Sequence, residues 1–330
     1  MSIFDYHGKI VKHLGRVCNY AYDLKSQPTS IDISLTDRCN HNCPGCIGNK
    51  TGRKELSVKE WDRIGKDLKK NGALSIKISG GGEPTLYKDY AQVISNFKEA
   101  GLVVGFYTNA SALKEEDVKK ITRDCTWIRV SLDAESPKRH AKVHGVKMWN
   151  ETLGGIRLLA KHKKRCTIGI GFLIGGDISW LYEAAKLSYE LGVDYAQFRP
   201  FNNFPLTAKV LEAELERQSV RYWENQKRKF DVLYSSNRLG AKFDRGYGYC
   251  HAKHFIPSLA TDGTVYPCCH LRGIEKYQVG DLKEQEFEEI MWDMNGRYFD
   301  FDSCVDHCRG DVINQLVETI RRPIPHAEFI

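Results

Sequence analysis

Between residues 31 and 200 the hydrophobic positions repeatedly change period, from every second residue to every third or fourth. Short β-branched runs with alternating character predict strands, and the amphipathic stretches between them predict helices. The expected strands are 31–36, 74–79, 102–107, 127–132, 167–173 and 194–199. The expected helices are 57–70, 87–100, 114–122, 150–162 and 179–190. Ser57 and Glu60 form a capping-box pattern at the start of the first helix.

Strands that alternate with helices indicate an α/β fold with a parallel sheet and right-handed crossovers. Curled up, such a sheet forms a partial (β/α)6 barrel, whose chemistry belongs at the C-terminal ends of the strands. Four parts are expected: an N-terminal extension (1–30), the barrel core (31–200), a helical linker (201–245) and a small α+β domain (246–330).

The last of these parts has its own pattern. Asp262-Gly263 between two apolar runs predicts a hairpin. Helices are expected over 283–294 and 310–321.

The composition is that of an ordinary globular protein, with 42% hydrophobic and 28% charged residues in 330. There is no secretory signal at the N-terminus and no apolar run of the roughly 20 residues that span a bilayer. We therefore expect a cytoplasmic protein without a membrane partner. The net charge of +7 permits an anionic partner without requiring one. A dedicated nucleic-acid binder would concentrate its charge more strongly.

Three cysteines, Cys39, Cys43 and Cys46, fall within eight residues after the first expected strand. Thiolates at such spacing usually share a metal, and a reducing compartment argues against disulfides among the eleven cysteines. Three ligands on a four-iron, four-sulfur cluster leave one iron open for a ligand from outside the protein. The spacing therefore predicts a metal site that the protein leaves incomplete.

Glycine and polar residues mark the ends of the other expected strands. They are Gly80-Gly81-Gly82-Glu83-Pro84, Thr108-Asn109, Ser131 with Asp133, Gly175-Gly176-Asp177, and Arg199. Consecutive glycines let the backbone approach a ligand closely, and either the Glu83 carboxylate or the neighbouring carbonyls could hold an ammonium group. Since the C-terminal ends of parallel strands share one edge, we expect these groups to form a ring around a binding site.

A second set of cysteines, Cys250, Cys268, Cys304 and Cys308, would be enough to close another metal site completely. Zinc and an iron–sulfur cluster both accept four thiolates, and the spacing does not separate them. Cys269 competes with Cys268 as a ligand. Cys125 and Cys166 border expected strands and are interpreted as structural.

These motifs together resemble the radical S-adenosylmethionine (SAM) superfamily, beginning with Cys39-x3-Cys43-x2-Cys46. Gly81-Gly82-Glu83 resembles the family motif that holds the methionine amino group. The resemblance also implies cofactor contacts at Thr108, Asn109, Ser131, Asp133 and Arg199. In this family the residue before the third cysteine is commonly aromatic and helps to hold adenine. Here it is Gly45, so that contact must come from the backbone or from elsewhere.

The C-terminal part resembles the SPASM/twitch extensions of the same superfamily, through Cys250-x12-Gly263-x4-Cys268 and Val279-Gly280-Asp281-Leu282. The resemblance implies that Cys250, Cys268, Cys304 and Cys308 hold one auxiliary [4Fe-4S] cluster with no open iron. The expected cofactors are therefore two [4Fe-4S] clusters and SAM, with an electron donor such as flavodoxin or ferredoxin.

The resemblance implies reductive cleavage of SAM to a 5'-deoxyadenosyl radical that abstracts hydrogen from a carbon. We expect a sugar-like, aminocyclitol-like or nucleotide-like substrate and net oxidation, with the auxiliary cluster accepting an electron. A purely anchoring auxiliary cluster and a redox-neutral rearrangement stay open. So does modification of a nucleic-acid base or of a ribosomal peptide, although 30 residues are too few for a leader-binding domain.

The general base is not assigned among Asp177, Arg199, Tyr247 and the histidines. A structural zinc protein that binds nucleic acid is the remote alternative, and it gives no account of the Gly-Gly-Glu stretch.

Overall fold

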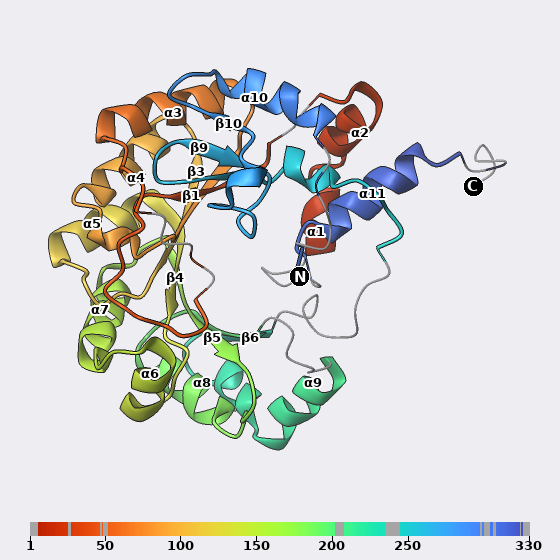
Figure 1. Ribbon diagram of the computed structural model, residues 1–330. Helices are drawn as coiled ribbons and strands as arrows, with labels where there is room; N and C mark the ends of the chain where they lie inside the picture. Colours follow the sequence, from red (N-terminus) through yellow and green to blue (C-terminus); the bar gives the residue numbers. More distant parts are fainter. Residues whose placement is uncertain are drawn as a thin grey trace.

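The computed structural model describes residues 6–25, 28–46, 48, 52–201, 208–234, 245–297, 299, 304–305, 308–323 and 325 (Figure 1). The strands are β1 (Ser30–Ser34), β2 (Ser75–Ser79), β3 (Val103–Thr108), β4 (Cys125–Ser131), β5 (Thr167–Ile174), β6 (Tyr195–Pro200), β7 (Asp231–Tyr234), β8 (Ser258–Leu259), β9 (Thr264–Tyr266) and β10 (Gly280–Asp281).

The α-helices are α1 (Tyr6–Val11), α2 (Leu14–Asp23), α3 (Val58–Lys70), α4 (Tyr90–Glu99), α5 (Glu115–Asp124), α6 (Pro137–His144), α7 (Trp149–His162), α8 (Leu181–Glu190), α9 (Ala208–Arg217), α10 (Phe287–Asp293) and α11 (Asp311–Arg321). Short 3₁₀ helices are η1 (Pro84–Leu86), η2 (Val220–Asn225), η4 (His251–His254), η5 (Glu275–Tyr277) and η6 (Met294–Gly296).

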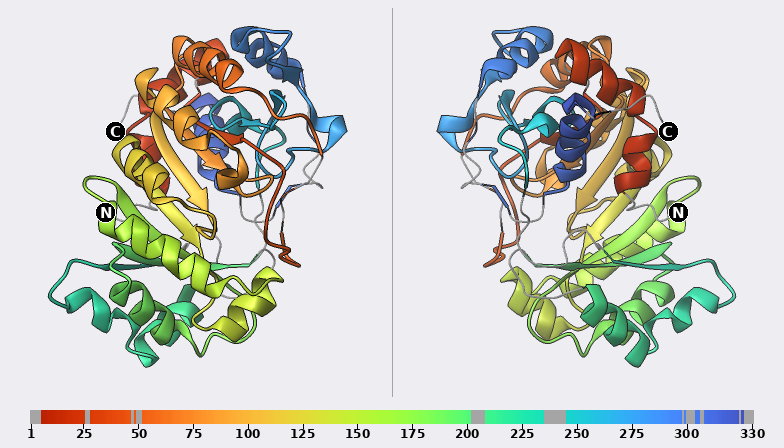
Figure 2. Two further views of the ribbon diagram at one scale, coloured as in Figure 1. Left: turned by 90° about the vertical axis from the view of Figure 1, so that its left-hand side faces the viewer. Right: turned by 90° about the vertical axis from the view of Figure 1, so that its right-hand side faces the viewer.

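The strands form one sheet in the order β10-β9-β8-β1-β2-β3-β4-β5-β6-β7. Strands β1 to β7 are parallel, and helices α3 to α8 lie on the convex side of the curved sheet (Figures 1 and 2). The six expected strands all form, with ends within two residues of the prediction. The α/β partial barrel is therefore confirmed. The capping box at the start of α3 also forms, with Ser57 and Glu60 bonded in both directions.

Between residues 31 and 245, one described strand and one described α-helix were not predicted. Residues 201–245 were interpreted as a helical linker, but they also contain β7, which pairs in parallel with β6 and extends the sheet to a seventh parallel strand. Helix α6 begins after Ser136, whose hydroxyl accepts a bond from the Arg139 amide, and ends at Gly145 in the left-handed conformation. Ser-Pro before a helix and glycine after it are ordinary boundary signals, and here they enclose only eight residues.

The predicted hairpin forms as β8 and β9, with Gly263 at its turn at a φ of +89°. Strand β8 also pairs in parallel with β1, with Asp32 opposite Ser258. The auxiliary region thus continues the sheet of the core. The two C-terminal helices expected over 283–294 and 310–321 are found as α10, followed by η6, and as α11.

The two faces of the sheet differ in character because side chains alternate along each strand. Isoleucine, valine and phenylalanine residues of β1 to β6 point toward the helices and form the main hydrophobic core. The alternate positions face the inside of the partial barrel. They carry Asp32, Lys77, Tyr107, Arg129 and Gln197. The inner face is therefore polar and can line a site.

The N-terminal helices pack against the C-terminal helix, which Figure 1 shows beside them. Val17, Tyr20, Phe255 and Val317 have no exposed surface in this second cluster. The N-terminal extension therefore shares a core with the auxiliary region. No helix in the described part of the chain is long and apolar enough to cross a membrane.

Candidate active site

The three cysteines of the loop after β1 lie close together. The Cys46 amide donates to the Cys43 carbonyl over 3.2 Å, and the Gly48 amide donates to the Cys46 Sγ over 3.3 Å. Burial, and next the neighbouring Cys46 and Cys39, raise the pKa of the Cys43 thiol to about 12. Three thiolates this close need a compensating cation, because each disfavours ionisation of the others. The donor set therefore suits a metal cluster.

The glycine segment after β2 is pressed against this loop. The Glu83 amide donates to the Arg38 carbonyl over 2.8 Å, just before the first cysteine. A Cβ on Gly82 would lie 1.9 Å from that same carbonyl oxygen, and a Cβ on Gly48 would lie 2.4 Å from the Gly81 carbonyl oxygen. Only glycine permits this approach of backbone to backbone. The structure thus places Gly81, Gly82 and the cysteine loop side by side.

The Glu83 carboxylate is occupied by protein donors. It accepts bonds from the Thr85 amide and hydroxyl (3.1 and 2.8 Å), the Thr108 hydroxyl (2.6 Å) and the Asn109 amide (2.7 Å). Burial raises the pKa of this carboxyl, against the effect of its donors. Three of these bonds go to Oε1 and one goes to Oε2, so Oε2 and the neighbouring backbone carbonyls both have capacity to accept a bond from an ammonium group.

Asn109 joins the end of β3 to the cysteine loop. Its side-chain amide donates to the Asn40 Oδ1 over 2.9 Å, and its Oδ1 accepts bonds from the Ser111 amide and hydroxyl. The Asn40 amide completes the network by donating to the Ser111 hydroxyl over 2.9 Å. At the end of β3, Thr108 and Asn109 therefore both bond to Glu83, and Asn109 also bonds to the cysteine loop.

At the end of β4, Asp133 adopts a left-handed backbone conformation, with φ of +53°. Its Oδ1 accepts a bond from the Leu173 amide over 2.6 Å, which ties this strand end to β5. Ser131 is half-buried at the last position of β4. Arg199 lies on β6 beside Arg129: a Cβ on Gly171 would be 3.7 Å from the Arg199 Nη2 and 3.3 Å from the Arg129 Nε.

Three histidines that the sequence analysis missed pack together, and two of them, His41 and His144, lie beside Cys43. The His144 Nδ1 lies 3.2 Å from the Cys43 Sγ, and its Nε2 lies 2.9 Å from the Leu132 carbonyl oxygen. The ring of His144 lies 4.9 Å from His41 and 4.5 Å from His140, between centroids. Burial lowers the pKa of His41 to about 3 and that of His140 to about 4.

His41, Cys43 and His144 each place one ligand atom within 4.8 Å of the others, so this corner could also hold a metal ion. The available signal was the spacing of His140 and His144, four residues apart on one helix face. It was not recognised because α6 itself was not predicted.

The second cysteine set also lies together. Burial and the nearby Cys250, together with Cys304 and Cys269, raise the pKa of Cys308 to about 12. Burial, Cys269 and Cys308 raise the pKa of Cys268 well above its usual range. All four predicted ligands are thus neighbours, and Cys269 lies in the same group. The choice between Cys268 and Cys269 stays open.

The auxiliary region reaches the glycine segment directly, because the Arg272 guanidinium donates to the Gly80 carbonyl. A side chain that lies between Cys268 and Cys304 in the sequence thereby helps to hold the glycine segment beside the first cysteine set. The two cysteine regions are parts of one assembly.

Comparison with known proteins agrees with this geometry. Residues 33–187 match the radical SAM superfamily, and residues 250–310 match SPASM, an iron–sulfur cluster-binding domain. A probable GTP 3',8-cyclase from Thermococcus kodakarensis is 23% identical over 222 residues, which cover 62% of this chain and 71% of that protein. A PqqA peptide cyclase from Rhodopseudomonas palustris is 36% identical over 92 residues, 27% of this chain and 24% of that protein.

Among solved structures, Streptococcus suis SuiB bound to precursor peptide SuiA has a TM-score of 0.68 at 18% identity, covering 88% of this chain and 71% of that chain. Native anSMEcpe with bound AdoMet has a TM-score of 0.58 at 16% identity, covering 80% of each chain. At these identities the likeness concerns the fold.

Proposed function

Because the chain belongs to the radical SAM superfamily and carries a C-terminal SPASM iron–sulfur domain, we propose that it removes a hydrogen atom from a carbon of a small sugar-like, aminocyclitol-like or nucleotide-like substrate, with net oxidation. One observation carries the proposal: the cysteine loop, the Gly81-Gly82 backbone and the end of β3 are locked together by Glu83 and Asn109.

The residues present fit the cofactors of this chemistry. In the proposal, Cys39, Cys43 and Cys46 bind three irons of a [4Fe-4S] cluster, and the carbonyls of Gly81 and Gly82 accept the methionine ammonium group. When bound, the cluster and SAM together supply a 5'-deoxyadenosyl radical after one electron arrives from a flavodoxin- or ferredoxin-type donor.

Four further residues support the proposed cofactor site. Glu83 and Asn109 hold the backbone in place through the bonds described above. Ser131 and Asp133 border the site from β4.

Phe201 supplies the aromatic side chain that position 45 lacks. A Cβ on Gly45 would lie 2.7 Å from the Cζ of Phe201, so the phenyl ring lies against this glycine. Phe201 directly follows β6 and is 41% exposed, which leaves part of its surface for a ligand. We propose that this ring contacts adenine, and that Gly45 is needed to make room for it.

The auxiliary site is proposed to hold one [4Fe-4S] cluster through Cys250, Cys268, Cys304 and Cys308. Four thiolates leave no iron open, so this cluster would accept an electron from the substrate rather than bind SAM. This role accounts for the net oxidation in the proposal.

The names of the relatives divide between two substrate classes. GTP 3',8-cyclases and a nucleotide dehydratase of Selenomonas ruminantium support a nucleotide-like substrate. Peptide modification is the second candidate, favoured by the 36% identity to a PqqA peptide cyclase over 92 residues.

Iron content and isotope transfer test the proposal. Anaerobically purified protein is expected to be brown and to contain about eight irons, from two four-iron clusters. With SAM and a reductant, a deuterated extract of nucleotides and sugars should place deuterium in 5'-deoxyadenosine, whereas a deuterated peptide fraction should not. A colourless protein containing zinc would contradict the cluster assignment, and transfer from peptides alone would favour the second candidate.

A further inference from the structure

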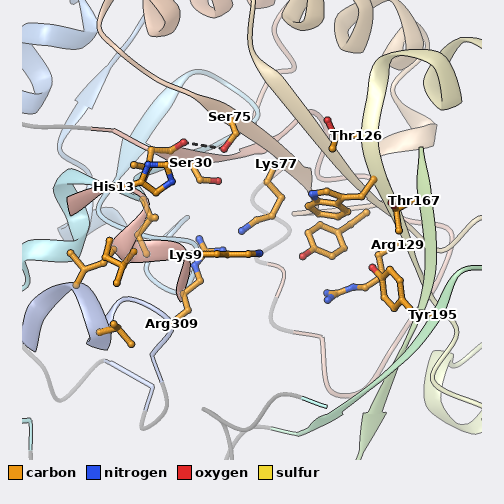
Figure 3. A pocket seen from close by; sticks show the side chains of 17 residues that line it. Lys9, His13, Ser30, Ser75, Lys77, Thr126, Arg129, Thr167, Tyr195 and Arg309 are labelled. Atoms are coloured by element: carbon orange, nitrogen blue, oxygen red, sulfur yellow. Dashed lines mark hydrogen bonds between the residues drawn. The ribbon is translucent and has the colours of Figure 1, made fainter. Parts of the chain in front are cut away.

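We propose that a basic cavity on the inner face of the sheet binds the phosphate group of the substrate. The cavity has a volume of about 510 Å³ and lies between the strands, α1 and the start of α11 (Figure 3). That volume is typical of sites for small molecules. Hydroxyl groups of Ser30 and Thr167 also line it, and they can donate to phosphate oxygens, whereas the Ser75 hydroxyl donates to the Thr29 carbonyl over 3.0 Å.

The charge of the cavity is strongly one-sided. Lys9, Lys77, Arg129 and Arg309 line it, and the described lining residues include no aspartate or glutamate. Asp32 lies behind them, 1% exposed, where it pairs with the Lys77 Nζ over 2.6 Å and with Arg309. Among the described residues, one carboxylate therefore lies beside four cationic side chains, and positive charge predominates in the lining of the cavity.

The burial and the contacts of Arg129 suit an arginine that binds an anion. It is only 6% exposed, its Nη1 donates to the Gln197 Oε1 over 2.5 Å, and its guanidinium lies 4.2 Å from the centre of the Tyr107 ring. Within the described part of the chain, its Nε donates to no acceptor. A buried donor without an acceptor is costly, and a planar guanidinium matches a phosphate through paired bonds.

Gly171 on the neighbouring strand leaves the space that this guanidinium needs, because a Cβ there would lie 3.3 Å from the Arg129 Nε. The site is therefore formed jointly by β4, β5 and β6. None of its members belongs to the cysteine or glycine motifs.

Position along the strands connects the cavity to the proposed cofactor site. Arg129 and Ser131 lie on the same face of β4, two residues apart, which corresponds to about 7 Å. Tyr107 immediately precedes Thr108, whose hydroxyl holds Glu83. A phosphate bound at Arg129 would direct the rest of its molecule toward the C-terminal ends of the strands.

A phosphate monoester, with nearly two negative charges at neutral pH, suits the excess positive charge better than a single carboxylate does. This inference rests on the proposed function, because it names the substrate class of the same site as a phosphorylated small molecule.

Calorimetric titration of the anaerobic, cluster-loaded full chain tests it, with ribose 5-phosphate, ribose and glutarate at constant ionic strength. Ribose 5-phosphate should bind at least about tenfold more tightly than ribose. Arg129→Gln should weaken its binding by about tenfold or more, since one charged hydrogen-bond donor group is lost. Arg157→Gln, an exposed arginine on α7, is the matched control and should bind as the wild type does.

Lys9→Gln is the second variant, in case Arg129→Gln fails to fold. Lys9 is exposed on α1, so its replacement should leave folding intact. It should weaken ribose 5-phosphate binding about threefold while leaving ribose unaffected. Equal binding of ribose and ribose 5-phosphate, or tighter binding of glutarate, would overturn the inference. A chain that cleaves SAM yet shows either result refutes the phosphate site alone, whereas a chain that binds no cluster refutes the proposed function itself.

Discussion

At the scale of single residues, the site depends on side chains that hold other groups in position. Glu83 belongs to the motif expected to bind the cofactor, yet its carboxylate accepts four bonds from Thr85, Thr108 and Asn109. Its removal would leave buried donors without an acceptor. We therefore interpret Glu83 as the residue that fixes the Gly81-Gly82 backbone beside the cysteine loop.

Phe201 gives a prediction at this scale. Phe201→Ala should weaken SAM binding by about tenfold, because stacking of a base on an aromatic ring contributes about 1–3 kcal/mol. Phe201→Leu should recover only part of the loss, since it restores apolar surface without the flat ring. Equilibrium binding of SAM to the cluster-loaded protein measures both, with Tyr222→Ala, an exposed aromatic residue of η2, as the control. Unchanged affinity in Phe201→Ala would place adenine elsewhere.

At the scale of elements, α6 brings a histidine pair to the cysteine loop. His140 is fully buried, and burial lowers its pKa to about 4 from an ordinary value of 6.5. The unfolded chain therefore takes up a proton below pH 6.5 that the folded protein resists. The contribution of neutral His140 to the free energy of unfolding is complete above pH 6.5, and it is lost as the pH falls toward 4.

Replacing His140 by Phe removes this titration while keeping an aromatic ring. Between pH 7 and pH 5 the wild type should lose more free energy of unfolding than His140→Phe, by on the order of 1 kcal/mol. Between pH 8 and pH 7 the two should change in parallel. Urea unfolding at the three pH values measures the difference. Equal losses between pH 7 and pH 5 would show that His140 is not held neutral.

Elements with a strong pattern were predictable, and short ones were not. The six core strands follow from alternation over five or more residues, whereas β7 has four residues and α6 has eight. Pairing of β8 with β1 joins residues more than 200 positions apart, and only the assembled fold selects it. In the site, the cysteine and glycine positions could be predicted from their spacing in the sequence. The roles of Phe201, His144 and Arg129 could not, because the residues that they contact belong to other elements.

At the scale of the whole molecule, the two ends of the chain share one core. Helices α1 and α2 pack on α11 and η4, and Arg321 of α11 donates to the Ala21 carbonyl over 2.9 Å. The N-terminal extension and the auxiliary region were predicted as separate parts. Their common core means that loosening one should loosen the other.

Val17→Ala tests this coupling, because Val17 is fully buried between these helices. The free energy of unfolding should fall by about 2 kcal/mol, from lost burial and the cavity left behind. Hydrogen exchange should accelerate in 14–23 and in 311–321 together. Val11→Ala, at a residue that is 63% exposed, is the control and should change little. Faster exchange confined to 14–23 would mean that the two ends are independent.

The central claim is that Cys39, Cys43 and Cys46 hold the cluster that cleaves SAM. Formation of 5'-deoxyadenosine by the anaerobic, reconstituted full chain, with SAM and dithionite, tests it most directly. The wild type should form this product, Cys43→Ala should form none, and Cys18→Ala, at a half-buried cysteine of α2, should match the wild type. Formation of 5'-deoxyadenosine by Cys43→Ala at the wild-type rate would contradict the account.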